Sequence, residues 1–318
     1  MKRLSVYLIS ILFSFGVFAE PLRVGLLNGP TCIPAAYLMD KNTADFEKFA
    51  DPQALLPKMI KKEMDVGFMP LNVAAKVYNS GNKAIILCAV TGLGNISVIT
   101  KDKELRHFTD LKGKTLYTAG QGATPEYMLR YLLSENKLSY STDGSDADVK
   151  LDFSIPTAQL AAQLISDKIQ YAVVPEPFAT IAQMKSQEVF AALDFQKEYL
   201  ELTGSPDIYP LSVMVVRKDY AKENPEALAA FLQEYQSAVD WTIANPKEAG
   251  LLVKKHGLGL EAAVVEKAIP VSNYTFIAAE NAVKMSEELL EIFIKNDKTS
   301  IGGKLPDREF YYDSKKLR

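Results

Sequence analysis

The chain has 318 residues, and its 36 Lys and Arg nearly balance its 39 Asp and Glu, which gives a formal charge of −3. This balance excludes a strongly basic nucleic-acid-binding protein, so no nucleic-acid partner is expected. A chain of this length exceeds what one compact core usually organises, so two domains or lobes are expected.

Residues 1–19 are predicted to be a cleavable signal peptide. Lys2 and Arg3 form a positive start, residues 4–18 are almost wholly apolar, and residues 17–19 include the small side chains that a signal peptidase reads. The apolar run is shorter than the ~20 residues that a membrane-spanning helix needs. No cysteine follows it directly, so a periplasmic protein without a lipid anchor is expected.

From residue 22 onwards, short apolar runs typical of buried strands alternate with helical segments. In the first part, strands are predicted at 22–27, 65–69, 83–90 and 96–100, and helices at 33–39, 54–64 and 71–78. In the second part, strands are predicted at 115–119, 150–153 and 171–174, and helices at 126–133, 158–165 and from 178 to about 185. A further strand at 211–216 precedes long helices at 225–243, 247–256 and 278–295. This alternation predicts mainly parallel sheets covered by helices.

An order of helix, strand, proline and helix occurs twice, at 54–77 and at 159–184, which indicates two lobes of similar architecture. We therefore expect an α/β protein of two Rossmann-like lobes joined by a hinge. Lobe 1 is predicted to be discontinuous, with residues 20–102 plus 210–318, and lobe 2 to span 103–209. The two crossings between the lobes are expected near 98–106 and 205–213.

Few residues suit metal binding or catalysis. The two histidines, His107 and His256, cannot form a zinc-type cluster with the two cysteines. The sequence contains no Gly-x-Ser-x-Gly elbow, P-loop or dinucleotide fingerprint, so no cofactor and no enzymatic activity are expected. In an oxidising compartment Cys32 and Cys88 could form a disulfide. The apolar run 84–90 favours a small buried side chain at Cys88 instead.

The candidate ligand-binding residues follow the predicted strands, because ligands of open α/β sheets bind beyond the carboxyl ends of the strands. Asn28, Thr31, Cys32, Asn72, Thr91, Gly92 and Asn95 are expected to form one wall of a cleft, and Gln121, Gly122, Ala123, Thr124 and Glu176 the other. Thr31 and Thr124 are also explained as plain helix caps.

The class of ligand stays open at this point. Helix N-termini near Thr31 and Ala123 favour an anionic group. Glu176, held between two prolines, favours a cationic or amino group, although it is equally explained as compensating a helix dipole. A zwitterion or an amino-heteroaromatic solute would satisfy both ends.

Several segments together resemble one family of proteins. They are the signal-like start, Leu22-Arg23-Val24-Gly25, Asp65-Val66-Gly67, Asp110-Leu111-Lys112-Gly113-Lys114, Val174-Pro175-Glu176-Pro177-Phe178 and the closing helices. In this order they resemble ABC-transporter periplasmic solute-binding proteins of the sulfonate/nitrate/taurine and thiamine-precursor-binding family. The resemblance spans most of the chain after residue 19. It implies a type II periplasmic-binding-protein architecture and an ABC permease in the inner membrane as partner.

The leading functional hypothesis is the substrate-binding component of an ABC transporter. Such a protein, expected to be a monomer, would capture a small polar or heteroaromatic solute between its lobes for uptake. One alternative is a small-carboxylate lyase or dehydratase on the same fold, with Glu176 as the base. Another is a ligand-sensing binding protein that acts through a separate membrane partner.

Overall fold

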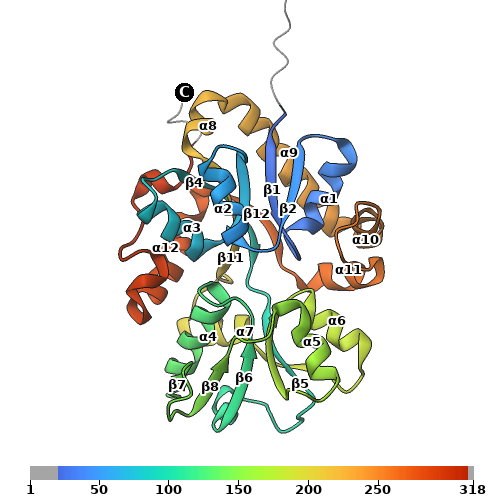
Figure 1. Cartoon of the computed structure of the whole chain (residues 1–318), viewed down its shortest axis with the longest axis vertical. Coiled ribbons are helices and arrows are strands. Elements are labelled where there is room, and N and C mark those ends of the chain that lie inside the picture. Colours follow the sequence, from blue (N-terminus) through green and yellow to red (C-terminus); the bar gives the residue numbers. More distant parts are fainter. Residues whose placement is uncertain (1–20, 314–318) are drawn as a thin grey trace, which may run out of the picture.

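The computed structural model describes residues 21–313, which form two α/β lobes, each built on a six-stranded sheet (Figure 1). The predicted signal peptide lies outside these residues. The first lobe, in blue and orange to red, is uppermost in Figure 1, and the second, in green and yellow, lies below it. The expected α/β class with two Rossmann-like lobes is confirmed.

The sheet of the first lobe has the order β12-β4-β11-β3-β1-β2. Its strands are β1 (Arg23–Leu27), β2 (Asp45–Phe49), β3 (Val66–Pro70), β4 (Ile85–Leu93), β11 (Pro210–Arg217) and β12 (Tyr274–Ala278). Strand β1 is parallel to β2 and β3, whereas β11 is antiparallel to both β3 and β4.

The sheet of the second lobe has the order β10-β5-β9-β6-β8-β7. Its strands are β5 (Ile96–Thr100), β6 (Lys114–Thr118), β7 (Tyr140–Ser141), β8 (Val149–Asp152), β9 (Tyr171–Pro175) and β10 (Phe190–Asp194). Strand β5 pairs antiparallel with β9 and β10, so the chain first changes sheet at Gly94 and Asn95. This is earlier than the crossing expected near 98–106, because an apolar strand pattern does not reveal which sheet the strand joins.

Twelve α-helices are described between residues 21 and 313. They are α1 (Cys32–Lys41), α2 (Pro52–Ile60), α3 (Leu71–Ser80), α4 (Thr124–Glu135), α5 (Thr157–Ile165), α6 (Phe178–Lys185), α7 (Phe195–Thr203), α8 (Lys218–Glu223), α9 (Pro225–Ala244), α10 (Pro246–Lys255), α11 (Ala262–Ala268) and α12 (Ala279–Asn296). Short 3-10 helices are η1 (Phe108–Leu111), η2 (Ile269–Val271), η3 (Lys298–Ile301) and η4 (Arg308–Phe310). None of the helices described between residues 21 and 313 is both long and apolar enough to cross a membrane.

Two glycines explain how helix α2 packs against the first sheet. A Cβ at Gly25 would lie 2.2 Å from Leu55 Cδ1, and one at Gly67 would lie 2.8 Å from Met59 Sδ. The glycines of the Arg23-Val24-Gly25 and Asp65-Val66-Gly67 segments therefore let the helix approach β1 and β3 closely.

The buried Asp65 carboxylate fixes the start of β3. It accepts hydrogen bonds from Arg23 Nε at 2.9 Å and Nη2 at 2.7 Å, and from Arg217 Nη2 at 3.0 Å. Two guanidinium groups thus compensate the burial of this charge, and the residue serves the fold of the first lobe.

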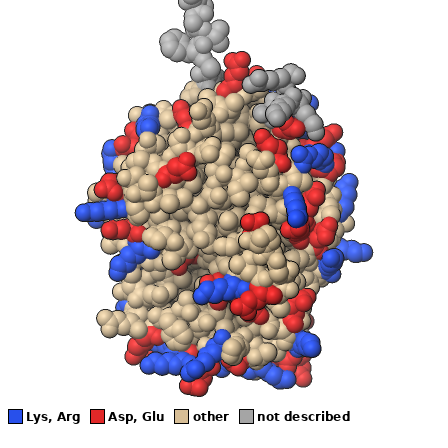
Figure 2. All heavy atoms as spheres, turned by 180° about the vertical axis from the view of Figure 1, so that it is seen from behind, with Lys and Arg blue, Asp and Glu red and all other residues tan. Residues whose placement is uncertain are grey.

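The two lobes touch on both sides of the crossings. On one side α4 packs against α12, with the ring centroids of Tyr127 and Phe293 5.6 Å apart. On the other side α6 contacts α11. On the face seen in Figure 2, acidic and basic side chains are interspersed, so neither sign of charge dominates that surface.

Candidate functional site

A cavity of about 1230 Å³ lies between the lobes, and we call it the interlobe cleft. Its lining comes from the segments 27–30, 48–53 and 70–80 of the first lobe and from 119–125, 156–158 and 175–178 of the second. Each segment follows the carboxyl end of a strand, which is where ligands of α/β sheets bind. The loop 257–260 between α10 and α11 also contributes.

Three helices begin at this cleft without a side-chain cap: α3, α4 and α5. The residue before each of them, Pro70, Ala123 or Pro156, lines the cavity. The starts of α2 and α6 differ, because Asp51 accepts a hydrogen bond from Ala54 N at 2.9 Å and Glu176 accepts one from Thr180 N at 3.1 Å. An uncapped helix N-terminus presents unpaired N–H groups and a partial positive charge, so the cleft favours an anionic group.

The side chains of the cleft add positive charge and apolar surface. Lys48 and Lys76 are exposed on its wall, and Lys48 Nζ donates to the Gly257 carbonyl at 2.9 Å. Leu56, Val73 and Phe178 are half-buried beside them. The cleft therefore combines donors for an anionic head with apolar surface for a small body.

A family model, the NMT1-like family, matches residues 34–254. The chain belongs to the NMT1-like family. No curated protein matches the chain.

Solved structures place this NMT1-like protein in the type II periplasmic-binding-protein fold. An ABC transporter protein from Parabacteroides distasonis is 21% identical with a TM-score of 0.76, covering 93% of this chain and 99% of that one. The periplasmic aliphatic sulphonate binding protein SsuA from Escherichia coli is 17% identical with a TM-score of 0.67, covering 91% and 92%. The periplasmic nitrate-binding protein NrtA from Synechocystis PCC 6803 is 14% identical with a TM-score of 0.66, covering 92% and 88%. At these identities the likeness concerns the fold.

Four of the predicted site residues of this NMT1-like protein line the interlobe cleft: Asn28, Gln121, Gly122 and Ala123. Two more, Asn72 and Thr124, are buried beneath it and join the lobes. Asn72 Nδ2 donates to the Gly122 carbonyl at 3.0 Å, and Thr124 Oγ1 donates to Asn72 Oδ1 at 3.2 Å. These two side chains connect the walls and do not line the cavity.

Thr31 and Cys32 lie at the start of α1 and do not line the cleft. Thr31 Oγ1 and Cys32 Sγ both donate to the Leu27 carbonyl, at 2.7 and 3.0 Å. The alternative reading of Thr31 and Thr124 as side-chain caps is wrong, because each hydroxyl bonds elsewhere and neither helix has a side-chain cap.

Thr91 and Gly92 are buried inside β4 and likewise do not line the cleft. Thr91 Oγ1 lies 3.2 Å from Ser212 Oγ on the neighbouring strand, and Gly92 pairs with the same residue. Strand β4 runs on to Leu93, beyond the end predicted at residue 90, so both residues belong to the strand and not to the loop after it.

Asn95 and Glu176 line a different cavity at the junction of the lobes. Glu176 Oε2 accepts a hydrogen bond from Thr180 N, at the start of α6, at 3.1 Å. This bond agrees with the interpretation that the carboxylate compensates the N-terminus of a helix. Burial raises the pKa of Glu176.

The sequence prediction missed Lys48, Lys76 and the segments 156–158 and 257–260. The rule that ligands bind after strand ends covers 156–158, since β8 ends at Asp152. It gives no signal for a loop between two helices or for surface lysines.

Both cysteines are buried and free, without a disulfide between them. Burial raises the pKa of Cys32 to about 11. Within residues 21–313, no group of three or more His, Cys, Asp or Glu side chains is placed to hold a metal ion.

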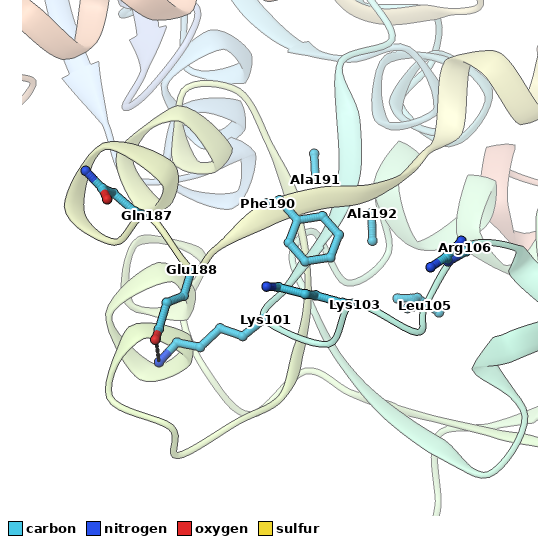
Figure 3. Close-up of a pocket in the computed structure, with 9 residues that line it drawn as sticks. All are labelled: Lys101, Lys103, Leu105, Arg106, Gln187, Glu188, Phe190, Ala191 and Ala192. Carbon is cyan, nitrogen blue, oxygen red and sulfur yellow. Dashed lines mark ion pairs between the residues drawn. The ribbon is translucent and has the colours of Figure 1, made fainter.

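A hollow of about 910 Å³ at the far end of the second lobe is a poorer candidate site (Figure 3). Lys101 is paired there with Asp167 at 2.7 Å and with Glu188 at 3.6 Å. Lys103 lies beside the ring of Phe190 in Figure 3. These charges lie at the surface or are already paired, which favours a solvated face over a binding site.

Proposed function

We propose that this protein is the solute-binding component of an ABC importer and that it captures a small anionic or zwitterionic solute in the interlobe cleft. The observation that carries the proposal is the set of three helix N-termini, of α3, α4 and α5, that meet at one cavity without side-chain caps. Such N–H groups need a partner, and an anion enclosed by two lobes supplies it.

The relatives in the fold support this proposal. Two of them are a periplasmic sulphonate-binding protein and a periplasmic nitrate-binding protein, and both of these ligands are anions. Together with the signal-like residues 1–19, they support export to the periplasm and delivery of the solute to a membrane permease. The chain acts as a monomer in this proposal, and the hinge at the two crossings closes the lobes over the solute.

The position of Glu176 argues against the lyase or dehydratase alternative. A general base must lie within hydrogen-bonding reach of the proton that it removes. Glu176 lines another cavity, and the Asp51 carboxylate in the cleft already caps α2.

A thermal-shift screen tests the proposal on the protein without residues 1–19. The panel contains nitrate, alkanesulfonates, carboxylates, amino acids, pyrimidines and flavins. One class with an anionic group is expected to raise the melting temperature, because a ligand that binds only the folded state stabilises it. A panel that shifts nothing would count against the proposal.

The change Gln121→Glu then tests the place of binding. A new carboxylate on the cleft wall costs a bound anion about 1–2 kcal/mol, so a loss of about tenfold or more in affinity is expected. The matched control is Gln187→Glu, an exposed residue of the hollow in Figure 3, which should leave the affinity unchanged. Equal losses in both variants would place the solute outside the cleft.

A further inference from the structure

A second cavity, of about 740 Å³, lies where the lobes join, and we call it the hinge cavity. Its walls include Asn95 and Ile208 from the two crossings, Val271 from the first lobe, and Glu176 and Met184 from the second. This volume is in the range of small-molecule sites. None of these residues lines the interlobe cleft.

The Asn95 side chain, in the wall of this cavity, carries a buried acceptor without a partner. It is only 6% exposed, and its Nδ2 donates to the Ser272 carbonyl at 3.0 Å. This bond fixes the orientation of the amide, because the reversed orientation would set two oxygens against each other. Within residues 21–313, Oδ1 has no hydrogen-bond partner. A buried acceptor without a partner is rare in native proteins, and here it leaves the partial negative charge of the amide oxygen uncompensated in the cavity wall.

Glu176 stands next to Asn95 and adds a carboxylate. Its N–H donates to the Asn95 carbonyl at 3.1 Å, which continues the β5–β9 ladder, so the two side chains share one face of the sheet. Glu176 is 8% exposed, and its carboxylate accepts hydrogen bonds from Thr180, whose backbone N lies 3.1 Å from Oε2. Neither lysine of the cavity wall, Lys197 or Lys267, pairs with it among the described ion pairs.

The other polar side chains at the base of the cavity already have partners. Asp194 Oδ1 caps α7 by accepting from Gln196 N at 2.9 Å and Lys197 N at 3.1 Å. Gln196 bonds to the backbone of Ile96 in both directions, at 3.0 and 3.2 Å. Among the buried polar groups of this wall within residues 21–313, those without a counter-charge or a hydrogen-bond partner are therefore the Glu176 carboxylate and Asn95 Oδ1, whereas Lys197 and Lys267 are exposed.

The exposed rim of the cavity carries apolar side chains beside Gln183, Lys197 and Lys267. Met184 is 39% and Val271 51% exposed, which is unusual for large hydrophobic side chains in this protein. Leu200 and Ile208 are half-buried beside them. The Glu176 carboxylate and the apolar side chains of the rim together fit a molecule with a cationic, donor-rich head and an apolar body.

We propose that the hinge cavity is a second small-molecule site, which takes an ammonium or amidinium group attached to an apolar body. Because both crossings and both lobes form its walls, an occupant stabilises the present arrangement of the lobes. The site is independent of the solute that the interlobe cleft binds.

Calorimetric titration with benzamidine tests this site, and benzamide is the uncharged control of the same shape. Benzamidine is expected to bind at least tenfold more tightly than benzamide. The change Glu176→Gln should remove that preference, whereas Glu188→Gln, on an exposed carboxylate elsewhere in the second lobe, should keep it. Met184→Arg on the exposed rim provides a second variant, whose added cation should weaken benzamidine binding at least tenfold.

Two results would overturn the proposal. The first is that benzamidine does not bind the unmodified protein, or binds it no better than benzamide does. The second is that Glu176→Gln and Met184→Arg leave its affinity unchanged, or that Gln121→Glu in the cleft changes it instead. Anion binding in the cleft is measured separately, so neither result bears on the proposed transport function.

Discussion

Replacing Asn72 by alanine is expected to weaken the closure of the two lobes. The side chain is fully buried and makes two hydrogen bonds to the second lobe, with the Gly122 carbonyl at 3.0 Å and with Thr124 Oγ1 at 3.2 Å. Each neutral hydrogen bond contributes about 1 kcal/mol. Losing both shifts the equilibrium towards the open state by about 2 kcal/mol, which is about 30-fold.

One spin label is placed on each lobe, and pulsed electron paramagnetic resonance measures the distance between the two labels. The distance distribution reports the open and closed populations. Asn79→Ala is the matched control, because Asn79 Nδ2 donates to the carbonyls of Ile301 and Lys304, both at 2.7 Å, within the first lobe. Asn72 Nδ2 also bonds to the same segment, at the Ser300 carbonyl. An equal closed population in Asn72→Ala and the unmodified protein would refute the reasoning. So would a closed population that falls equally in Asn72→Ala and Asn79→Ala.

Three further predictions concern stability and reactivity. Gly94→Ala places a Cβ 2.4 Å from Tyr209 Cζ at the crossings. The free energy of unfolding, measured in urea, should therefore fall by about 1–3 kcal/mol. An unchanged unfolding midpoint would contradict this close packing. Burial raises the pKa of Glu176 above its ordinary 4.5, so the protein should lose stability relative to Glu176→Gln as the pH rises from 4.5 through the raised pKa. The melting temperature of the unmodified protein minus that of Glu176→Gln should therefore fall over this pH range. A difference that stays flat or rises with pH would contradict this sign. Burial raises the pKa of Cys32 to about 11, and Cys88 is buried as well. Both thiols should therefore react with iodoacetamide only after the protein unfolds. A disulfide found by mass spectrometry, or rapid alkylation of the native protein, would disprove this prediction.

The strands at the centre of each sheet were predictable because they are buried on both faces. The runs that form β3, β4, β9 and β11 are nearly continuous in apolar residues. The sequence prediction missed β2, whose Asp-Phe-Glu-Lys-Phe segment lies at a sheet edge and is largely exposed. Half-exposed strands at sheet edges lack the apolar signal on which the prediction depends.

The candidate site was predictable where a strand ended as expected. Asn28 and Gln121 follow β1 and β6 and line the cleft, in keeping with the rule for open sheets. Thr91 was misplaced because β4 extends past it. Asn95 and Glu176 follow strand ends as well, but which cavity a side chain enters depends on how the two sheets join, which no local pattern contains.

The crystal structure of the protein with the solute found by the thermal-shift screen tests the central claim most directly. The account predicts the anionic group of that solute in the interlobe cleft, within hydrogen-bonding distance of backbone N–H groups at the starts of α3, α4 or α5. A solute bound outside the cleft, or one that turns a cationic group towards these helix N-termini, would contradict it.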